Sequence, residues 1–342
     1  MTRPEELSPR DAVKRFLGRK QSERSDSSIS TYYYRLKLFF EWCEAVGIEE
    51  VGSLSGWDFE SYESARGADD IKPPSLKNEM QTLKKFIEYL ERIEAVDDGL
   101  SKKVHVPNVP RHAESDDTKL ATEDARELLY YYRNTDDEYG SRMHAFLELA
   151  WHTGARLGGI RGLDIRDYDR EKHFVEFHHR PESDTPLKNG RDGERPVGFP
   201  AIVGEVLDHY IRHNRENIHD EHGRQPLFTT QSGNRVSKSA LRTTAYQGTY
   251  ACWHSVCPHG KDPETCEYRS YSKASTCPSS RSPHQIRTGS ITWQRDLGFP
   301  PEVVAERVNS SVDVIERYYD KATARERMEV RRPYVEEMRF EE

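Results

Sequence analysis

The stretch TGARLGGIRGL, residues 153–163, decides the fold of this 342-residue chain, because its first arginine follows directly after an apolar helix. The run from Ala145 to Trp151 has the apolar spacing of a helix, and Gly154 suits the left-handed position that ends one. Arg156 follows on the turn. A second stretch, SPHQIRTGSIT at residues 282–292, places a histidine and an arginine three positions apart. Together the two stretches predict one site with two arginines.

The chemistry that fits these residues is phosphoryl transfer to a tyrosine. Two arginine forks, Arg156 and Arg287, can stabilise negative charge on the non-bridging oxygens of a phosphodiester without a metal ion. A leaving 5'-hydroxyl needs a proton, and Lys188 and His284 fit as acid and base. Tyr319 is the candidate nucleophile, and its attack would leave a 3'-phosphotyrosine bond that a second strand can reseal without a nucleotide cofactor.

Each of these residues also has a structural interpretation. A single arginine after a Thr-Gly turn often has only a structural role, and a lysine in a polar hairpin is ordinarily a solvated charge. The ordered combination favours the functional interpretation. The adjacent Tyr318 leaves the choice of nucleophile open, and Tyr319 is preferred because it falls ten residues after Asn309 and precedes an Asp-Lys pair.

These motifs resemble those of the tyrosine recombinase (phage integrase) family, most closely its archaeal members, over residues 5–335. The resemblance implies that TGARLGGIRGL carries the first catalytic arginine, Arg156, and that SPHQIRTGSIT carries His284 and Arg287. LKNGRDGERPV, residues 187–197, resembles the hairpin of the catalytic lysine, here Lys188.

Two positions depart from the pattern of the family. Gly159 stands where the family commonly has glutamate, and Asn309 replaces a histidine in RVNSSVDVIERYYD, residues 307–320. The side-chain amide of Asn309 can still donate a hydrogen bond to a phosphate oxygen, so it is kept as a candidate site residue.

The resemblance implies a site-specific recombinase of a virus or mobile element, acting in integration or excision. It implies a tetramer on double-stranded DNA attachment sites, with a directionality factor as a further partner and no cofactor for catalysis. The alternative is a DNA-binding regulator that keeps the fold without strand exchange, which Gly159 and Asn309 motivate. The tail at residues 322–342 is expected to form a helix that docks either on a neighbouring subunit or on its own domain.

The expected fold is mainly α with a small antiparallel β-sheet, in the two-domain architecture that the resemblance implies. Residues 1–104 form a helical, SAM-like core DNA-binding domain, residues 105–118 a linker, and residues 119–342 an α+β catalytic domain with a cysteine-rich insertion at 250–280. The proline-containing, acidic stretch VHVPNVPRHAESDDTK at 104–119 supports the boundary.

Local patterns predict several elements. Two amphipathic helices in the first domain are marked by apolar stripes, Leu36, Phe39, Phe40 and Cys43 in one and Leu76, Met80, Leu83, Ile87 and Leu90 in the other. The second helix is expected to begin after Ser75 as N-cap. HFVEFHH at 173–179 and ERPVGFP at 194–200 predict strands, with Lys188 in the loop between them.

Composition limits the class of protein. There are 59 acidic and 51 basic residues, a net charge of -8, which is an unusual sign for a DNA-binding protein but leaves room for a local basic groove. The acidic excess fits either a salt-rich cytoplasm or ordinary surface variation. No apolar run approaches the roughly 20 residues of a membrane span, and the N-terminal residues lack an apolar signal sequence. A cytoplasmic location without membrane contact is therefore expected.

Four of the five cysteines lie close together in the sequence, just before SPHQIRTGSIT. In a reducing compartment such a cluster favours a metal site, and zinc would accept four thiolates. Free buried thiols remain the alternative, and His254 or His259 could replace a thiol. The predicted ligands of a structural zinc ion are Cys252, Cys257, Cys266 and Cys277.

Overall fold

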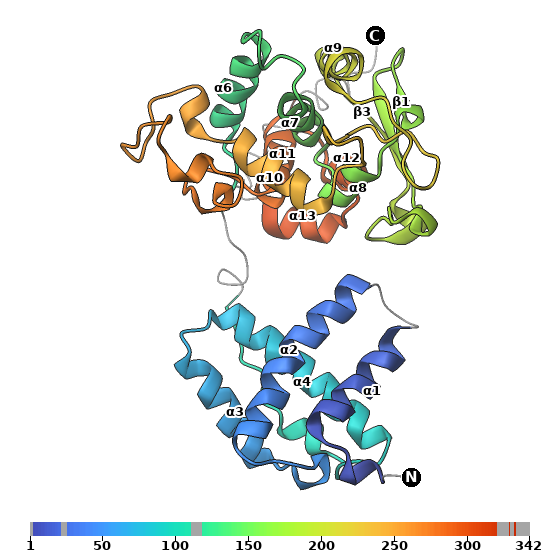
Figure 1. The fold of residues 1–342 in the computed structure, drawn as a ribbon, viewed down its shortest axis with the longest axis vertical. Helices are drawn as coiled ribbons and strands as arrows, with labels where there is room; N and C mark the ends of the chain where they lie inside the picture. Colours follow the sequence, from blue (N-terminus) through green and yellow to red (C-terminus); the bar gives the residue numbers. More distant parts are fainter. Residues whose placement is uncertain (1–2, 22–25, 111–117, 320–327, 329–331, 333–342) are drawn as a thin grey trace, which may run out of the picture. The chain divides into compact units, whose positions relative to one another are not determined.

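The computed structural model describes residues 3–21, 26–110, 118–319, 328 and 332. The chain divides into two compact units, Met1–Asp117 and Thr118–Glu342 (Figure 1). Each unit has its own hydrophobic core. The division falls within the range 105–118, although Val104 and Val106 still pack in the core of the first unit. Among the described residues, no helix has both the length and the apolar character needed to cross a membrane.

The first unit is built from the helices α1 (Pro9–Gln21), α2 (Asp26–Ala45), α3 (Gly56–Ala68) and α4 (Pro73–Arg92). The apolar stripes of α2 and α4 face the core as predicted, with Leu76 half-buried, the other members buried, and Cys43 fully buried. The predicted start of α4 is wrong: Lys72 is the N-cap, and Pro73 and Pro74 form the first turn. Proline suits this position because the first backbone N–H groups of a helix have no partner within it.

The second unit places helix α7 (Arg142–Thr153) at its centre, in contact with α6, α9, α10 and α11 (Figure 1). Ser141 caps its start by accepting a hydrogen bond from the His144 amide, and Gly154 ends it in the left-handed conformation at φ +58°. The predicted helix end at Gly154 is therefore confirmed. The other helices are α6 (Thr122–Arg133), α8 (Leu157–Gly162), α9 (Ala201–His209), α10 (Lys238–Gly248), α11 (Pro283–Asp296), α12 (Pro301–Val308) and α13 (Val312–Tyr319).

A three-stranded antiparallel sheet in the order β1-β2-β3 completes this unit, with β1 at Tyr168–Asp169, β2 at Phe174–Phe177 and β3 at Arg195–Gly198. Strands β2 and β3 lie inside the two predicted strands, with Val175 opposite Val197. Helix α8 contacts β2, and α12 contacts β3. The expected fold class, mainly α with a small antiparallel sheet, is thus confirmed.

Gly159 packs closely against strand β2. A Cβ atom at Gly159 would lie 3.2 Å from the ring of Phe177, and Phe177 is buried. A side chain at this position would require the ring of Phe177 to shift slightly, because β2 lies against this turn of α8.

Candidate active site

Arg156 and Arg287, the two predicted arginines, meet at the C-terminal end of α12. Arg156 is the N-cap of α8, and its Nη1 donates to the main-chain oxygen of Asn309 at 2.6 Å. Arg287 lies on α11 and is only 5% exposed. Its Nη1 donates to the carbonyl of Val308 at 2.7 Å and to that of Gly154 at 2.6 Å. The end of a helix carries partial negative charge, so it stabilises both cations where they converge.

Asn309 is the C-cap of α12 and adopts the left-handed conformation at φ +53°. Asparagine tolerates this region better than most residues, which fits its presence here. Its Oδ1 accepts a hydrogen bond of 2.9 Å from Nδ2 of Asn189, the residue after Lys188. A Cβ atom at Gly193 would lie 2.5 Å from Nδ2 of Asn309, so glycine permits the close approach. The hairpin that carries Lys188 is therefore seated against Asn309.

His284 lies on the first turn of α11, which Ser282 and Gln285 fix through a reciprocal capping box. The His284 side chain is exposed to solvent. Partial enclosure, followed by the positive charges of Arg287, Arg156 and Lys188, lowers the pKa of His284 below its usual value. All three predicted cations thus act on one imidazole ring. The structure brings Arg156, Lys188, His284, Arg287 and Asn309 into a single electropositive site.

Helix α13 carries the two candidate nucleophiles. It packs against α11 and α12, with Ile315 fully buried, and ends at Tyr319. The side chains of Tyr318 and Tyr319 lie outside the described part of the chain, as does the tail at residues 322–342 except for Met328 and Arg332. The choice between the two tyrosines and the docking of the tail stay predictions.

Buried ion pairs fix the base of the Lys188 hairpin. Nε of Arg224 donates to the buried Asp164 at 2.7 Å, while its Nη1 donates to the hydroxyls of Ser183 at 2.6 Å and Thr185 at 2.8 Å. Arg180 binds Asp167 at 2.6 Å. Because each guanidinium here has a carboxylate partner, this cluster neutralises its own charge and can serve as a rigid support for the hairpin.

Two further arginines lie at the site without having been identified from the motifs. Nε of Arg195 donates to the carbonyl of Arg307 at 2.7 Å, and Nη2 of Arg307 donates to the carbonyl of His152 at 2.9 Å. Burial, then Arg156 and Arg307, lower the pKa of Arg195 to about 10. Burial also lowers the pKa of Arg307. The sequence around Arg195 predicts only a strand, so nothing in it reveals this placement.

The four clustered cysteines are free and half-buried. Burial raises the pKa of Tyr250, and the nearby thiols of Cys277, Cys252 and Cys266 add to this shift, while Arg269 opposes it. No group of three or more His, Cys, Asp or Glu side chains within the described ranges is arranged to hold a metal ion. Zinc binding by Cys252, Cys257, Cys266 and Cys277 therefore stays a prediction.

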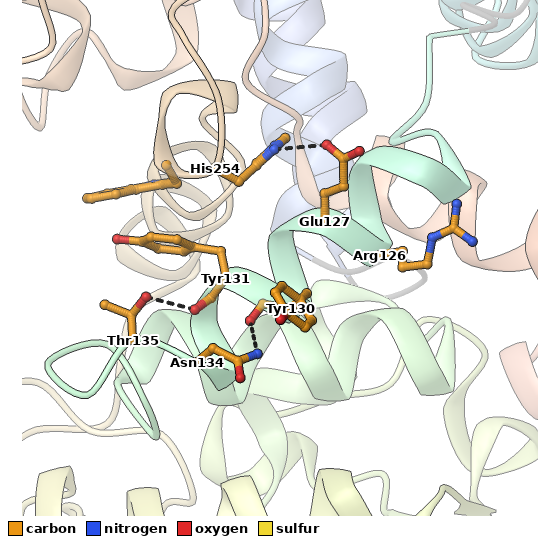
Figure 2. A pocket seen from close by; sticks show the side chains of 8 residues that line it. Arg126, Glu127, Tyr130, Tyr131, Asn134, Thr135 and His254 are labelled. Carbon is orange, nitrogen blue, oxygen red and sulfur yellow. Dashed lines mark hydrogen bonds and ion pairs between the residues drawn. The ribbon is translucent and has the colours of Figure 1, made fainter.

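A cavity of about 560 Å³ lies elsewhere in the second unit, between α6 and the start of the cysteine-rich segment (Figure 2). His254 pairs with Glu127 at 3.1 Å on one side of it, and Asn134 donates to the carbonyl of Tyr130 at 2.7 Å on the other. Its lining contains none of the six predicted catalytic residues and consists of Arg126, Glu127, Tyr130, Tyr131, Asn134, Thr135, Trp253 and His254.

No protein-family model matches the chain. The tyrosine recombinase XerC of Chromohalobacter salexigens is 24% identical over 233 residues, which cover 68% of this chain and 72% of that relative. The Tn1549 transposon integrase in complex with a circular intermediate DNA has a TM-score of 0.68 at 14% identity, with 97% of this chain and all of that chain covered. A lambda integrase dimer bound to a core site has a TM-score of 0.63 at 10% identity, over 93% and 78% of the two chains. The chain is thus similar in sequence to tyrosine recombinases and shares the fold of the solved integrases.

Proposed function

We propose that this chain is a site-specific DNA recombinase that cuts and rejoins DNA through a 3'-phosphotyrosine bond to Tyr319. The observation that carries the proposal is the convergence of Arg156 and Arg287 on successive carbonyls at the end of α12, with His284 beside them. Two guanidinium groups at one point match the charge of a phosphodiester during in-line displacement.

In the proposed cleavage step, the hydroxyl oxygen of Tyr319 attacks the phosphorus, and the bond from phosphorus to the 5'-oxygen breaks. His284 takes the phenolic proton, since its lowered pKa favours the neutral ring that can accept one. Lys188 gives a proton to the leaving 5'-oxygen. Arg156 and Arg287 bind the non-bridging oxygens, and Asn309 adds an amide donor. The reverse steps join the phosphotyrosine to a second strand.

The proposed substrate is double-stranded DNA carrying attachment sites of a virus or mobile element. The solved Tn1549 and lambda integrases contain DNA, and lambda integrase has also been solved as a tetramer on a Holliday junction. A tetramer on DNA, a directionality factor and a cytoplasmic location belong to the same proposal for this chain. A regulator without strand exchange is not favoured, because the cations of the site remain together.

Trapping on a nicked duplex tests the proposal. A nick close to the cleavage site releases a short fragment on cleavage, which prevents religation, so the wild-type chain should form a DNA adduct that survives detergent. Tyr319→Phe should abolish the adduct, and Tyr318→Phe should keep it. The opposite result for the two variants would reassign the nucleophile, and no adduct with the wild-type chain, in dilute buffer or in high salt, would favour the regulator.

An archaeal, salt-adapted origin is a further part of the proposal, supported by the acidic excess of 59 against 51 residues. Adduct formation should then increase from dilute buffer to molar potassium chloride. A rate that is highest in dilute buffer would contradict salt adaptation, since added salt ordinarily weakens binding to DNA phosphates.

A structural zinc ion on the cysteine-rich segment is proposed as well. The segment carries four free, half-buried thiols, three of them near Tyr250, and its helices are only short 3-10 turns. Binding would require the thiols to move closer together than they lie in this structure. Metal analysis of the purified protein should find one zinc per chain, and chelation should lower the melting temperature. A metal-free protein of equal stability would rule the ion out.

A further inference from the structure

Arg195 joins two parts of the candidate site that are far apart in the sequence. Its Nε donates to the carbonyl of Arg307 at the end of α12, and its Nη1 donates to the carbonyl of Gly193 at 2.9 Å within the Lys188 hairpin. The guanidinium also stacks on the ring of Phe177, 4.6 Å from its centre. The side chain thus has a fixed position between the hairpin and the helix.

Three consecutive carbonyls at the end of α12 each accept a hydrogen bond from a different arginine. Arg195 binds the carbonyl of Arg307, Arg287 that of Val308 and Arg156 that of Asn309, at 2.7, 2.7 and 2.6 Å. Two of these arginines are the predicted phosphate ligands. The third comes from β3, which continues directly from the hairpin.

The charge of Arg195 has no carboxylate partner within the described part of the chain: its polar contacts there are carbonyl groups, and Arg156 and Arg307 are its charged neighbours. The arginines around Asp164 differ, since Arg180, Arg224 and Arg235 all reach that carboxylate. A half-buried cation surrounded by other cations is costly unless an anion joins it. A DNA phosphate at Arg156 and Arg287 would supply that anion.

We propose that Arg195 is a positioning residue for strand cleavage, which holds the Lys188 hairpin against α12 and keeps a third positive charge beside the phosphate site. The inference rests on the proposed cleavage reaction. Without the Arg195 bridge, the hairpin loses a contact to α12 next to the one from Asn189 to Asn309. Lys188 would then reach the leaving 5'-oxygen less often.

The test uses two nicked DNA substrates that differ in one atom. In one, the leaving group is the normal 5'-oxygen, and in the other it is sulfur, which departs as a thiolate and needs no proton from Lys188. The variants are Arg195→Met, Arg195→Lys and Lys188→Ala, with Arg170→Met as the control. Arg170 is an exposed arginine of the same unit that pairs with Asp208. Adduct rates, DNA affinity and melting temperature are measured for each.

The expected loss for Arg195→Met is about 100-fold on the oxygen substrate, at the lower end of what general acid catalysis contributes. On the sulfur substrate the loss of rate for Arg195→Met should be at least about tenfold smaller than on the oxygen substrate. Lys188→Ala should show the same difference between the two substrates. Arg195→Lys keeps the charge, and its adduct rate on the oxygen substrate should lie between those of Arg195→Met and wild type. Arg170→Met should match wild type on both substrates.

An Arg195→Met rate within threefold of wild type on the oxygen substrate would overturn the inference. An equal loss on both substrates would do so as well, since it would indicate a general structural or binding defect. If Arg195→Met does not fold, the same comparison is made with Arg195→Lys: an equal loss of rate on the oxygen and sulfur substrates would overturn the inference. A wild-type chain without any adduct would refute the proposed function itself, which is a distinct outcome.

Discussion

Replacing Arg287 with lysine should weaken both the fold and the chemistry of the site, by separable amounts. The guanidinium donates from one nitrogen to two carbonyls, those of Gly154 and Val308, in a position that is only 5% exposed. Lysine lacks the planar fork and places its ammonium on a stem of different geometry, so we expect it to retain one of the two bonds.

The loss of one hydrogen bond from a charged donor costs about 1.5–3 kcal/mol. For a unit of this size each kcal/mol lowers the melting temperature by about 2–4 °C, so we expect a decrease of about 3–12 °C. Cleavage should slow by a further factor of about 100–1,000, the usual effect of removing a donor to the developing charge.

Calorimetry and single-turnover adduct formation on nicked DNA measure the two effects, with Arg212→Lys as the control. Arg212 is an exposed arginine that pairs with Asp208 at 3.4 Å and should tolerate lysine. A cleavage rate within threefold of wild type would refute the assignment of Arg287 to the phosphate. An unchanged melting temperature would refute the role of its two carbonyl partners.

Three further predictions concern the packing and the electrostatics around the site. Gly289→Ala places a Cβ atom 2.1 Å from the carbonyl of Leu120, so it should destabilise the second unit by about 1–3 kcal/mol in urea unfolding. Gly18→Ala in α1, where a Cβ atom has no neighbour within 4 Å, should instead stabilise the first unit by about 0.5–1 kcal/mol. Equal changes in stability for Gly289→Ala and Gly18→Ala would refute the packing argument. Burial favours a raised pKa for Glu148, but hydrogen bonds from His144, His152 and Arg133 outweigh it and lower the pKa well below the usual value. Because the folded pKa lies below the unfolded value of about 4.3, the stabilisation is complete above that pH and is lost as the pH falls through the folded pKa. Glu148→Gln should therefore cost about 3 kcal/mol at pH 7 and less in acid; a constant difference from wild type across pH would contradict this. NMR titration of the DNA-free protein should place the pKa of His284 below that of an ordinary histidine, and Lys188→Ala should raise it toward that value. An equal pKa of His284 in wild type and in Lys188→Ala would show that the hairpin lies farther from His284.

The sequence predicts those features of the fold that depend on local pattern. The buried stripe of α4, the helix end at Gly154 and strands β2 and β3 follow from apolar spacing and from the conformational freedom of glycine. Ser75 fails as a cap because a proline pair can itself form the first helical turn. Strand β1, with two residues, is too short to produce a recognisable alternation.

The candidate site is predictable only in part. The motifs make Arg156, His284 and Arg287 candidates because each lies in a distinctive local sequence. The partners of these residues come from tertiary contacts, as the bond from Arg156 to the carbonyl of Asn309 illustrates. Arg195 could not be identified in this way, since a strand pattern contains no information about which carbonyl its side chain meets.

The anchoring of three arginines on main-chain oxygens has a consequence for how the site can evolve. Every amino acid supplies a carbonyl, so residues 307–309 can change their side chains without removing the acceptors for Arg195, Arg287 and Arg156. Asparagine at 309 also accepts the left-handed backbone there. Substitutions at this position could therefore change the rate of the proposed reaction while the main-chain acceptors of the three guanidinium groups are kept.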